Sequence, residues 1–391
     1  MHIGIVGPVS TKQLSPALGR LTGLEPVGMG GVPVNHLILE LIQRGQWISV
    51  FTLSPDVPPS DAPTIVHGHN LTIYYGPFRT RARNRMKDFF SVERDFLLRT
   101  ILQVSPNILH AHWQYEWGWA ALDSKIPTLL TCHDSPLHVL KAQMDLYRLG
   151  RLLMAVYVLR RAKHITAVSE YTAKALRIFT NRKIKIIPNF EPSCVFELYG
   201  EKSHSKASKI VMVNNGFSAL KNVSTALRGF GMLRAKHREA TLHLYGSDYG
   251  QNEIAEKWSK DQGLSQNVYF HGYRAFDELM KELKSMDIFL HTAIEESCPM
   301  VLIEASALGL PIIAGKKSGG VPWLLDYGRA GLLVDIKSPS SVAEALSRLM
   351  DDEDMFKRLS LAGRKNAEVR FSPDVVLHQY LNEYKNLLQS H

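Results

Sequence analysis

Short apolar runs alternate with longer amphipathic segments along almost the whole chain. In the first half these runs are typical of buried β-strands, and they predict strands at residues 3–6, 48–53, 108–112, 128–132, 165–168 and 184–187. In the second half they predict strands at residues 210–213, 241–245, 268–271, 288–291, 311–314 and 331–334, followed by helices from about residue 338. Such alternation is typical of doubly wound, mostly parallel sheets, so the predicted fold class is α/β.

The two alternating patterns are separated by a polar stretch around residues 201–209. A chain of 391 residues is too long for one typical core and suits two domains. We therefore expect a first domain at residues 1–190, a linker at 191–208, a second domain at 209–372 and a last segment at 373–391.

The net charge of +9 is concentrated in the first half of the chain. Residues 1–190 hold 22 Lys and Arg against 12 Asp and Glu, a balance of +10, whereas the remainder holds 24 against 25, a balance of −1. The densest cluster contains Arg79, Arg81, Arg83, Arg85 and Lys87. We expect this cluster to bind an anionic acceptor or an anionic membrane surface, although a solvated loop is the plainer alternative. A nucleic-acid partner is not expected, because no recognised binding motif accompanies the charge.

The chain shows no apolar run near the roughly 20 residues of a membrane span and no signal-peptide pattern. A cytoplasmic protein is expected, peripheral on the inner face of the membrane if the basic cluster binds lipid. The three cysteines lack a C-x-x-C spacing, which predicts neither a disulfide framework nor a zinc site.

The most informative segment places two carboxylates, Glu296 and Glu304, eight positions apart. Pro299 suits the first turn of a helix and Gly309 the residue just past its end, so Glu296 is predicted in the preceding loop and Glu304 inside the helix. Between them, the free amides of the helix start form a natural anion site. The residues that would supply these amides are Cys298, Met300 and Val301. Two hydroxyl-binding carboxylates around a phosphate site fit a nucleotide-sugar.

This spacing, with its Glu-Ala and Gly-Leu-Pro continuation, resembles the E-x7-E motif of glycosyltransferase family 4. The resemblance implies the GT-B fold: two Rossmann-like domains facing across a cleft, with a C-terminal helix returning to the first domain. It also implies that a hexose-type unit moves from a nucleotide-diphosphate sugar to a glycan or lipid-linked acceptor with retention of configuration, and that neither metal nor cofactor takes part. Glu296 would then position the donor sugar and Glu304 the ribose.

Weaker family-like segments occur in the first half. Gly30 and Gly31 resemble the loop that contacts the donor's phosphate or sugar, and His133 resembles the histidine that lines the cleft near the transferred sugar. His112, in a second strand-end cluster, is expected to face the acceptor. The pair His110-x-His112 also suggests metal, but a third ligand at a suitable spacing is missing, so we reject a metal site.

In the second half, Asn215 and Lys221 lie where the family has an Arg and a Lys that bind the donor diphosphate. Lys221 is present, but the expected Arg is not, and amide side chains or Arg274 are the candidates to replace it. Tyr273 and Arg274 follow a segment whose backbone reads the nucleobase in the family.

Three other functions remain open from the sequence. They are a nucleotide-sugar epimerase on the same fold, a catalytically silent nucleotide-sugar-binding subunit and, last, a dinucleotide oxidoreductase. The oxidoreductase is disfavoured because Gly28-x-Gly30-Gly31 does not form the G-x-G-x-x-G fingerprint.

Overall fold

The structure is a computed structural model that describes residues 1–19, 21–200 and 208–389. Its contacts divide the chain into two compact units. The first unit contains Met1–Asn189 and Pro373–His391, and the second contains Phe190–Ser372. Residues 201–207, the core of the predicted linker, lie outside the described residues.

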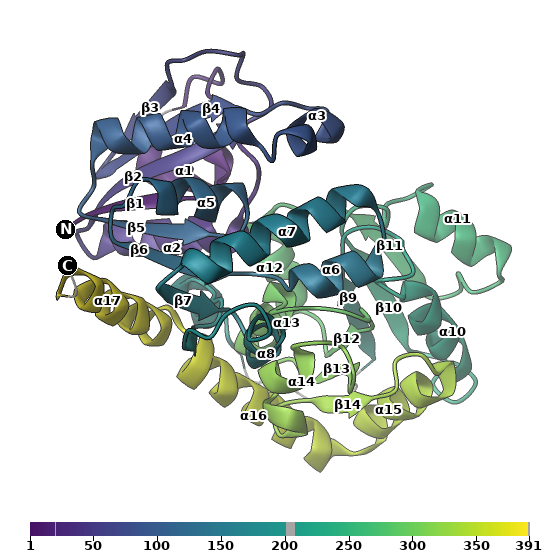
Figure 1. Cartoon of the computed structure of the whole chain (residues 1–391). Helices are drawn as coiled ribbons and strands as arrows, with labels where there is room; N and C mark the ends of the chain where they lie inside the picture. The colour runs from purple at the N-terminus through teal and green to yellow at the C-terminus, as the bar shows by residue number, and fades with distance from the viewer. Residues whose placement is uncertain (20, 201–207, 390–391) are drawn as a thin grey trace. The chain divides into compact units, whose positions relative to one another are not determined.

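In the described part of the first unit, eight strands form one sheet in the order β3-β4-β2-β1-β5-β6-β7-β8 (Figure 1). The strands are β1 (His2–Val6), β2 (Trp47–Ser54), β3 (Thr64–Gly68), β4 (Leu71–Pro77), β5 (Ile108–His112), β6 (Thr128–Cys132), β7 (His164–Ala167) and β8 (Ile184–Ile186). Neighbouring strands run parallel except β3 and β4. The sequence analysis missed this antiparallel pair at the edge of the sheet.

Helices cover both faces of the first sheet. They are α1 (Thr11–Leu18), α2 (Val32–Gln43), α3 (Ala82–Lys87), α4 (Ser91–Val104), α5 (Glu116–Asp123), α6 (Pro136–Ala142), α7 (Leu146–Arg161), α8 (Glu170–Leu176) and, from the end of the chain, α17 (Pro373–Gln389). Helix α4 packs on α5, and α5 on α7, whereas α17 packs on α2, β5 and β6. The expected return of the C-terminal helix to the first domain is therefore confirmed.

The second unit has a parallel sheet in the order β11-β10-β9-β12-β13-β14. Its strands are β9 (Lys209–Val213), β10 (Thr241–Tyr245), β11 (Val268–Gly272), β12 (Ile288–His291), β13 (Ile312–Gly315) and β14 (Leu332–Val334). Its helices are α9 (Ser193–Glu197), α10 (Val223–Leu233), α11 (Ile254–Asp261), α12 (Phe276–Lys284), α13 (Met300–Ala307), α14 (Val321–Leu324), α15 (Pro339–Asp351) and α16 (Glu353–Phe371).

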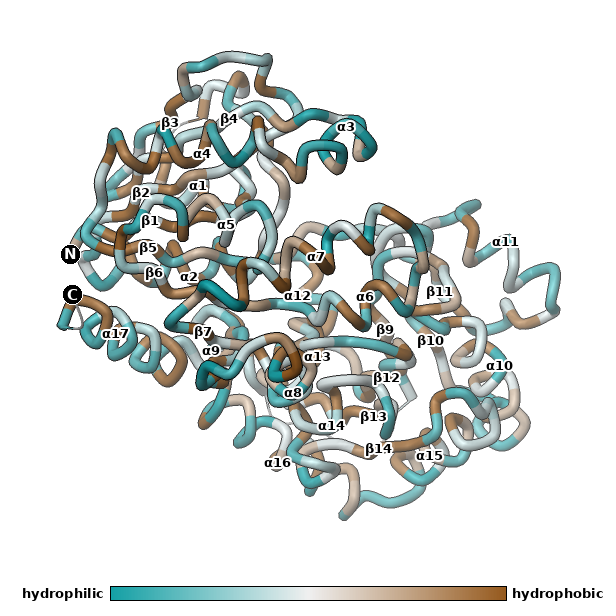
Figure 2. The backbone as a smooth tube through the Cα atoms, viewed as in Figure 1, coloured by the Kyte–Doolittle hydropathy of each residue, from teal (hydrophilic) through white to brown (hydrophobic). Residues whose placement is uncertain are grey.

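Each predicted strand overlaps an observed one. The central strands were predictable because they are buried on both faces, as in most parallel sheets, and so consist of nearly continuous apolar runs. One expectation needs correction: residues 193–197, assigned to the linker, form helix α9 with Val195 fully buried. Figure 2 shows the apolar strands inside each unit. Within the described residues, no helix combines the length and apolar character needed to cross a membrane.

Candidate functional site

An ion pair joins two loops at the carboxyl ends of neighbouring strands in the second unit. Nζ of Lys221, between β9 and α10, lies 2.6 Å from Oε1 of Glu296, between β12 and α13. The two loops are also held by their backbones, because the amide of Ile294 donates to the carbonyl of Leu220 at 2.8 Å. Strands β9 and β12 pair in the sheet, which is why residues 75 positions apart in sequence meet here. The structure thus brings together two residues that the sequence analysis assigned to one site.

The glycine loop after β13 fixes the backbone of Glu296. The amide of Gly320 donates to the carbonyl of Glu296 at 2.7 Å. Gly319 has φ +60°, and a Cβ there would lie 2.3 Å from the same carbonyl oxygen. Only glycine allows this close approach, so the Ser318-Gly319-Gly320 segment sets the position of the carboxylate.

Helix α13 begins one residue later than expected, because Pro299 lies at the N-cap and Met300 is the first helical residue. Gly309, with φ +74°, follows the helix end as predicted. No side chain caps the helix start, and Met300 and Val301 are half-buried there. Backbone amides at a helix start attract anions, so this turn can serve as the anion site that the sequence predicts.

Glu304 lies inside α13, 5% exposed, and its Oε2 has no hydrogen-bond partner among the described residues. Burial raises the pKa of this carboxyl to about 7. A second buried carboxyl, Glu191, interacts electrostatically with Glu304. Burial raises the pKa of Glu191 well above its ordinary value, and the negative charge of Glu304 raises it further. The sequence analysis missed Glu191, which it placed in the linker, and no local pattern marks it.

His291, at the end of β12, was also missed as a site residue. Its side chain is 1% exposed, and its Nε2 lies 4.0 Å from Oε1 of Glu296. Neither ring nitrogen has a hydrogen-bond partner in the described part of the chain. Burial lowers the pKa of His291 to about 4, so the ring is a neutral neighbour of the Lys221–Glu296 pair at pH 7.

The structure separates the two candidates for the missing arginine. Nε of Arg274 lies 3.4 Å from Glu282, and its Nη1 donates to the carbonyl of Tyr273. Oδ1 of Asn215 accepts hydrogen bonds from the amide and the hydroxyl of Ser247, which leaves its Nδ2 as a donor. Nδ2 of the buried Asn214 lacks a hydrogen-bond partner within the described ranges. Within the described residues, both asparagines can therefore offer an Nδ2 donor, and that of Asn214 is buried. Tyr273, expected near the nucleobase, is 72% exposed.

In the first unit, Gly30 and Gly31 form the turn into α2, with φ values of +89° and +77°. A Cβ on Gly31 would lie 2.0 Å from the carbonyl oxygen of Pro8, so a larger residue cannot replace it there. Asn35 holds this turn by donating from Nδ2 to the carbonyl of Gly30. The glycines are thus required by backbone geometry alone, and contact with a donor remains a prediction.

Three histidines form a row at the ends of β5 and β6. Nδ1 of His112 lies 2.9 Å from Nε2 of His133, and the rings of His110 and His112 are 4.1 Å apart. His110 also contacts the hydroxyls of Tyr384 and Thr131, each at 2.7 Å. Burial lowers the pKa of His110 and of His133 to about 3, and that of His112 also falls well below its usual value. All three rings are therefore neutral at pH 7.

Other residues hold His133 in place. The ring of Trp113 stacks on it with centroids 4.2 Å apart, and Trp113 itself has an unusual φ of +66°. Asp134, the next residue, accepts hydrogen bonds from Gln114 and Tyr115. Among the described residues, no group of three His, Cys, Asp or Glu side chains is arranged to hold a metal ion.

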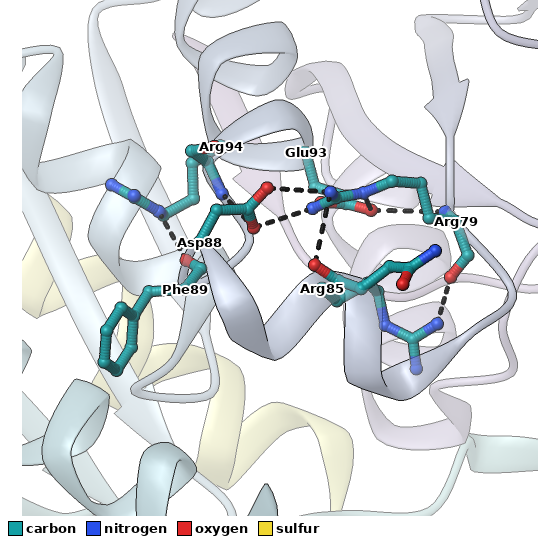
Figure 3. A network of polar contacts seen from close by, with 8 residues as sticks. Arg79, Arg85, Asp88, Phe89, Glu93 and Arg94 are labelled. Atoms are coloured by element: carbon teal, nitrogen blue, oxygen red, sulfur yellow. Dashed lines mark hydrogen bonds and ion pairs between the residues drawn. The ribbon is translucent and has the colours of Figure 1, made fainter.

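The prediction that all five cations at residues 79–87 are available to an anionic partner is wrong for two of them. The guanidinium of Arg79 binds both Asp88 and Glu93, at 2.7 and 2.6 Å, and Glu93 is fully buried (Figure 3). Arg85 is buried as well: it donates to the carbonyl of Arg79 and lies over the ring of Phe78, 4.1 Å from its centroid. Arg79 and Arg85 therefore hold the fold together and are not free for an anionic partner. The exposed cations that remain are Arg81, Arg83 and Lys87.

Comparison with known proteins gives matches in both units. The family described as "Glycosyltransferase Family 4" matches residues 30–190, and "Glycosyl transferases group 1" matches residues 198–366. A D-inositol 3-phosphate glycosyltransferase of Corynebacterium glutamicum is 32% identical over 389 residues, covering 90% of this chain and 89% of the relative. An N-acetyl-alpha-D-glucosaminyl L-malate synthase of Bacillus anthracis is 24% identical, covering 94% and 97%.

Solved structures agree in fold at low sequence identity. Sucrose-phosphate synthase from Thermosynechococcus elongatus has a TM-score of 0.79 at 18% identity, covering both chains completely. The Anabaena protein HepE, in complex with UDP-glucose, has a TM-score of 0.69 at 17% identity, covering 99% of this chain and all of HepE. Because the Corynebacterium relative matches nine-tenths of the sequence and the solved structures share the fold, the chain belongs to glycosyltransferase family 4 and has the GT-B fold.

Proposed function

We propose that the protein is a retaining glycosyltransferase that moves a hexose-type sugar from a nucleotide-diphosphate sugar to an acceptor hydroxyl. The single observation that carries the proposal is the Lys221–Glu296 ion pair beside the start of α13, with the buried Glu304 further along the same helix. It combines a cation, a carboxylate and helix amides at strand ends, where ligands bind in open parallel sheets.

Each residue has a distinct role in this proposal. Lys221 and the amides of α13 would stabilise the negative charge that develops on the leaving diphosphate. Glu296 would accept hydrogen bonds from donor-sugar hydroxyls, and Glu304 would bind the ribose. Asn214 offers a further donor in place of the missing arginine. Neither a metal ion nor another cofactor is part of the proposal.

His133 would contact the sugar near the reacting carbon as a neutral group, because its pKa is lowered to about 3 by burial. The bond from the anomeric carbon to the leaving phosphate oxygen breaks as the acceptor oxygen attacks from the same face. The departing phosphate oxygen then takes the acceptor proton. A glycosidase-like scheme with two carboxylates at the reacting bond fits less well, because Glu304 is assigned to the ribose.

The relatives support assembly of a glycan or glycolipid as the biological setting. One, from Mycobacterium tuberculosis, is a GDP-mannose-dependent phosphatidylinositol monomannoside mannosyltransferase that is 35% identical over 120 residues. Another, from Rhizobium meliloti, is a lipopolysaccharide core biosynthesis glycosyltransferase that is 27% identical over 202 residues. We propose a cytoplasmic enzyme that meets a glycan or lipid-linked acceptor at the inner face of the membrane.

A donor screen tests the proposal. The protein is incubated with UDP-, GDP- and ADP-sugars, and binding is followed by thermal shift and slow donor hydrolysis by release of nucleoside diphosphate. Glu296→Gln should abolish hydrolysis with little change in thermal stability. Formation of a new sugar nucleotide without acceptor would instead indicate an epimerase, and donor binding without any turnover would indicate a catalytically silent nucleotide-sugar-binding subunit. The anomeric configuration of the product, measured by NMR, tests retention.

A further inference from the structure

The outward face of α7 is apolar. Leu146, Leu149, Leu153 and Tyr157 recur every three or four residues, which places them on one side of the helix. Their exposed fractions are 84%, 43%, 54% and 44%, and Met144, just before the helix, is 87% exposed. The opposite side of α7 is buried in the unit through Met154, Ala155, Val158 and Leu159. Apolar stretches recur along α7 in Figure 2.

Such a helix is unusual for the surface of a water-soluble unit. A surface helix ordinarily carries polar residues on the side away from the core, and α7 carries leucines on both sides. A single exposed leucine needs no explanation, but a continuous row of them marks a surface that binds something apolar.

Cations border this apolar face. Helix α3 packs directly on α7, because a Cβ on Gly150 would lie 2.2 Å from Sδ of Met86. The three exposed cations left in the basic cluster, Arg81, Arg83 and Lys87, are on α3 or just before it. Lys141 and Arg160 are further exposed cations, on α6 and α7. No ion pair is found for these five among the described residues.

The acidic groups around α7 are neutralised by other arginines. Asp123 binds Arg161 at 2.7 Å, and Asp145 binds Arg148. Glu116 likewise binds Arg151. The border of the apolar face is therefore positively charged overall, which suits an anionic partner with an apolar interior and disfavours a neutral protein surface.

We propose that this face of the first unit, Met144 with the outward residues of α7 and the exposed cations of α3, docks on an anionic phospholipid surface. The leucines would enter the boundary between head groups and acyl chains, and Arg81, Arg83 and Lys87 would bind the charged head groups. Arg79 and Arg85 play no part. The inference does not depend on the proposed reaction.

The test uses the full chain and sedimentation with vesicles of phosphatidylcholine, alone or mixed with phosphatidylglycerol. Two variants probe the surface: the triple change Leu146→Ser, Leu149→Ser and Leu153→Ser, and the triple change Arg81→Ser, Arg83→Ser and Lys87→Ser. The matched control changes two exposed leucines elsewhere, Leu102→Ser and Leu361→Ser, which are 54% and 56% exposed. Thermal unfolding checks that each variant is folded.

Wild type and control should bind the acidic vesicles, and the leucine variant should bind at least tenfold more weakly at every salt concentration. The cation variant should bind acidic vesicles more weakly than wild type mainly at low salt. At high salt, screening already weakens the attraction between the wild-type cations and the lipid. In a second measurement, the emission that Leu149→Trp adds to that of the six native tryptophans, taken as the difference from wild type, should shift to the blue on acidic vesicles only.

Equal vesicle binding by wild type and the leucine variant would overturn the proposal. So would absence of vesicle binding by wild type, or a wild-type dimer that the leucine change converts to a monomer, because the face would then bind a second copy. Donor hydrolysis in solution without vesicles should be the same in wild type and the leucine variant, which separates this result from a failure of the proposed reaction.

Discussion

The ammonium of Lys221 and the carboxylate of Glu296 lie 2.6 Å apart, across two loops that follow neighbouring strands. A donor diphosphate would compete with Glu296 for the same ammonium. In the proposed function, binding of the donor and positioning of the carboxylate would thus be coupled through one lysine.

Lys221→Ala should lower kcat/KM by about 10²- to 10³-fold, because the charge that stabilises the leaving diphosphate is lost. The measurement is steady-state release of nucleoside diphosphate in the presence of acceptor. Lys236→Ala is the matched control, since Lys236 also forms an ion pair, with Asp351, but on an exposed surface. Near wild-type turnover in Lys221→Ala would show that this lysine only holds Glu296.

At about pH 8, where the carboxyl is mostly ionised, Glu304→Ala should weaken the binding of the free nucleoside diphosphate by roughly tenfold or more, since a charged hydrogen bond to a buried hydroxyl contributes about 1.5 to 3 kcal/mol. Isothermal titration calorimetry measures the Kd. Glu344→Ala, at an exposed position of α15, should leave the Kd unchanged. An unaltered Kd in folded Glu304→Ala would refute the assignment to the ribose.

The same carboxyl should make stability depend on pH. Burial raises its pKa from the ordinary 4.5 to about 7, so the folded state binds this proton more tightly than the unfolded state. The resulting stabilisation is fully present below about pH 4.5 and is lost as the pH rises through about 7. The unfolding free energy is measured by urea denaturation at about pH 5.5 and about pH 8. Its change between these two pH values should be smaller for Glu304→Gln than for wild type. Identical differences would mean that the carboxyl is not held in its neutral form.

His133→Ala should reduce kcat far more than donor affinity, the pattern of a contact made mainly in the transition state. Because the pKa of His133 is lowered to about 3, the pH profile of wild-type kcat should show no inflection from this ring between about pH 6 and about pH 8. His164→Ala, at the start of β7, is the control. Full activity in His133→Ala would assign the ring a purely structural role.

Arg79→Ala should destabilise the protein by about 3 to 5 kcal/mol, because it leaves the fully buried Glu93 without its cation. Arg83→Ala, at an exposed position four residues later, should change the unfolding free energy by no more than about 0.5 kcal/mol. Chemical denaturation compares the two. If both variants change the unfolding free energy by a similarly small amount, Arg79 is not needed for the fold and is available to an anionic partner.

The parallel strands and the helix between Glu296 and Gly309 could be predicted because local sequence determines them. Runs that are apolar at every position indicate strands buried on both faces, and Pro299 and Gly309 mark the helix ends within one residue. The edge pair β3 and β4 was missed because β3 is mostly exposed and lacks such a run.

The side-chain partners could not be predicted in the same way. The burial of Glu191 beside Glu304 and the binding of Arg79 to Glu93 depend on packing between segments that no local pattern connects. A charge run in sequence gives only the number of cations. Which of them are exposed is decided by acids and aromatic rings from other elements, and here two of the five are used inside the fold.

The position of α17 has a consequence for synthesis. The hydroxyl of Tyr384 contacts His110, and Glu383 binds Lys185 at 2.5 Å, so the first unit is completed by residues that are translated after the whole second unit. Phe190–Ser372 contains all of the second unit and leaves the ribosome before them. Domains generally fold as units during translation, but here the amino-terminal unit must wait for its final helix. During that interval the nascent first unit exposes the apolar surface that Val376, Leu377 and Leu387 later cover, and this surface is then open to chaperones.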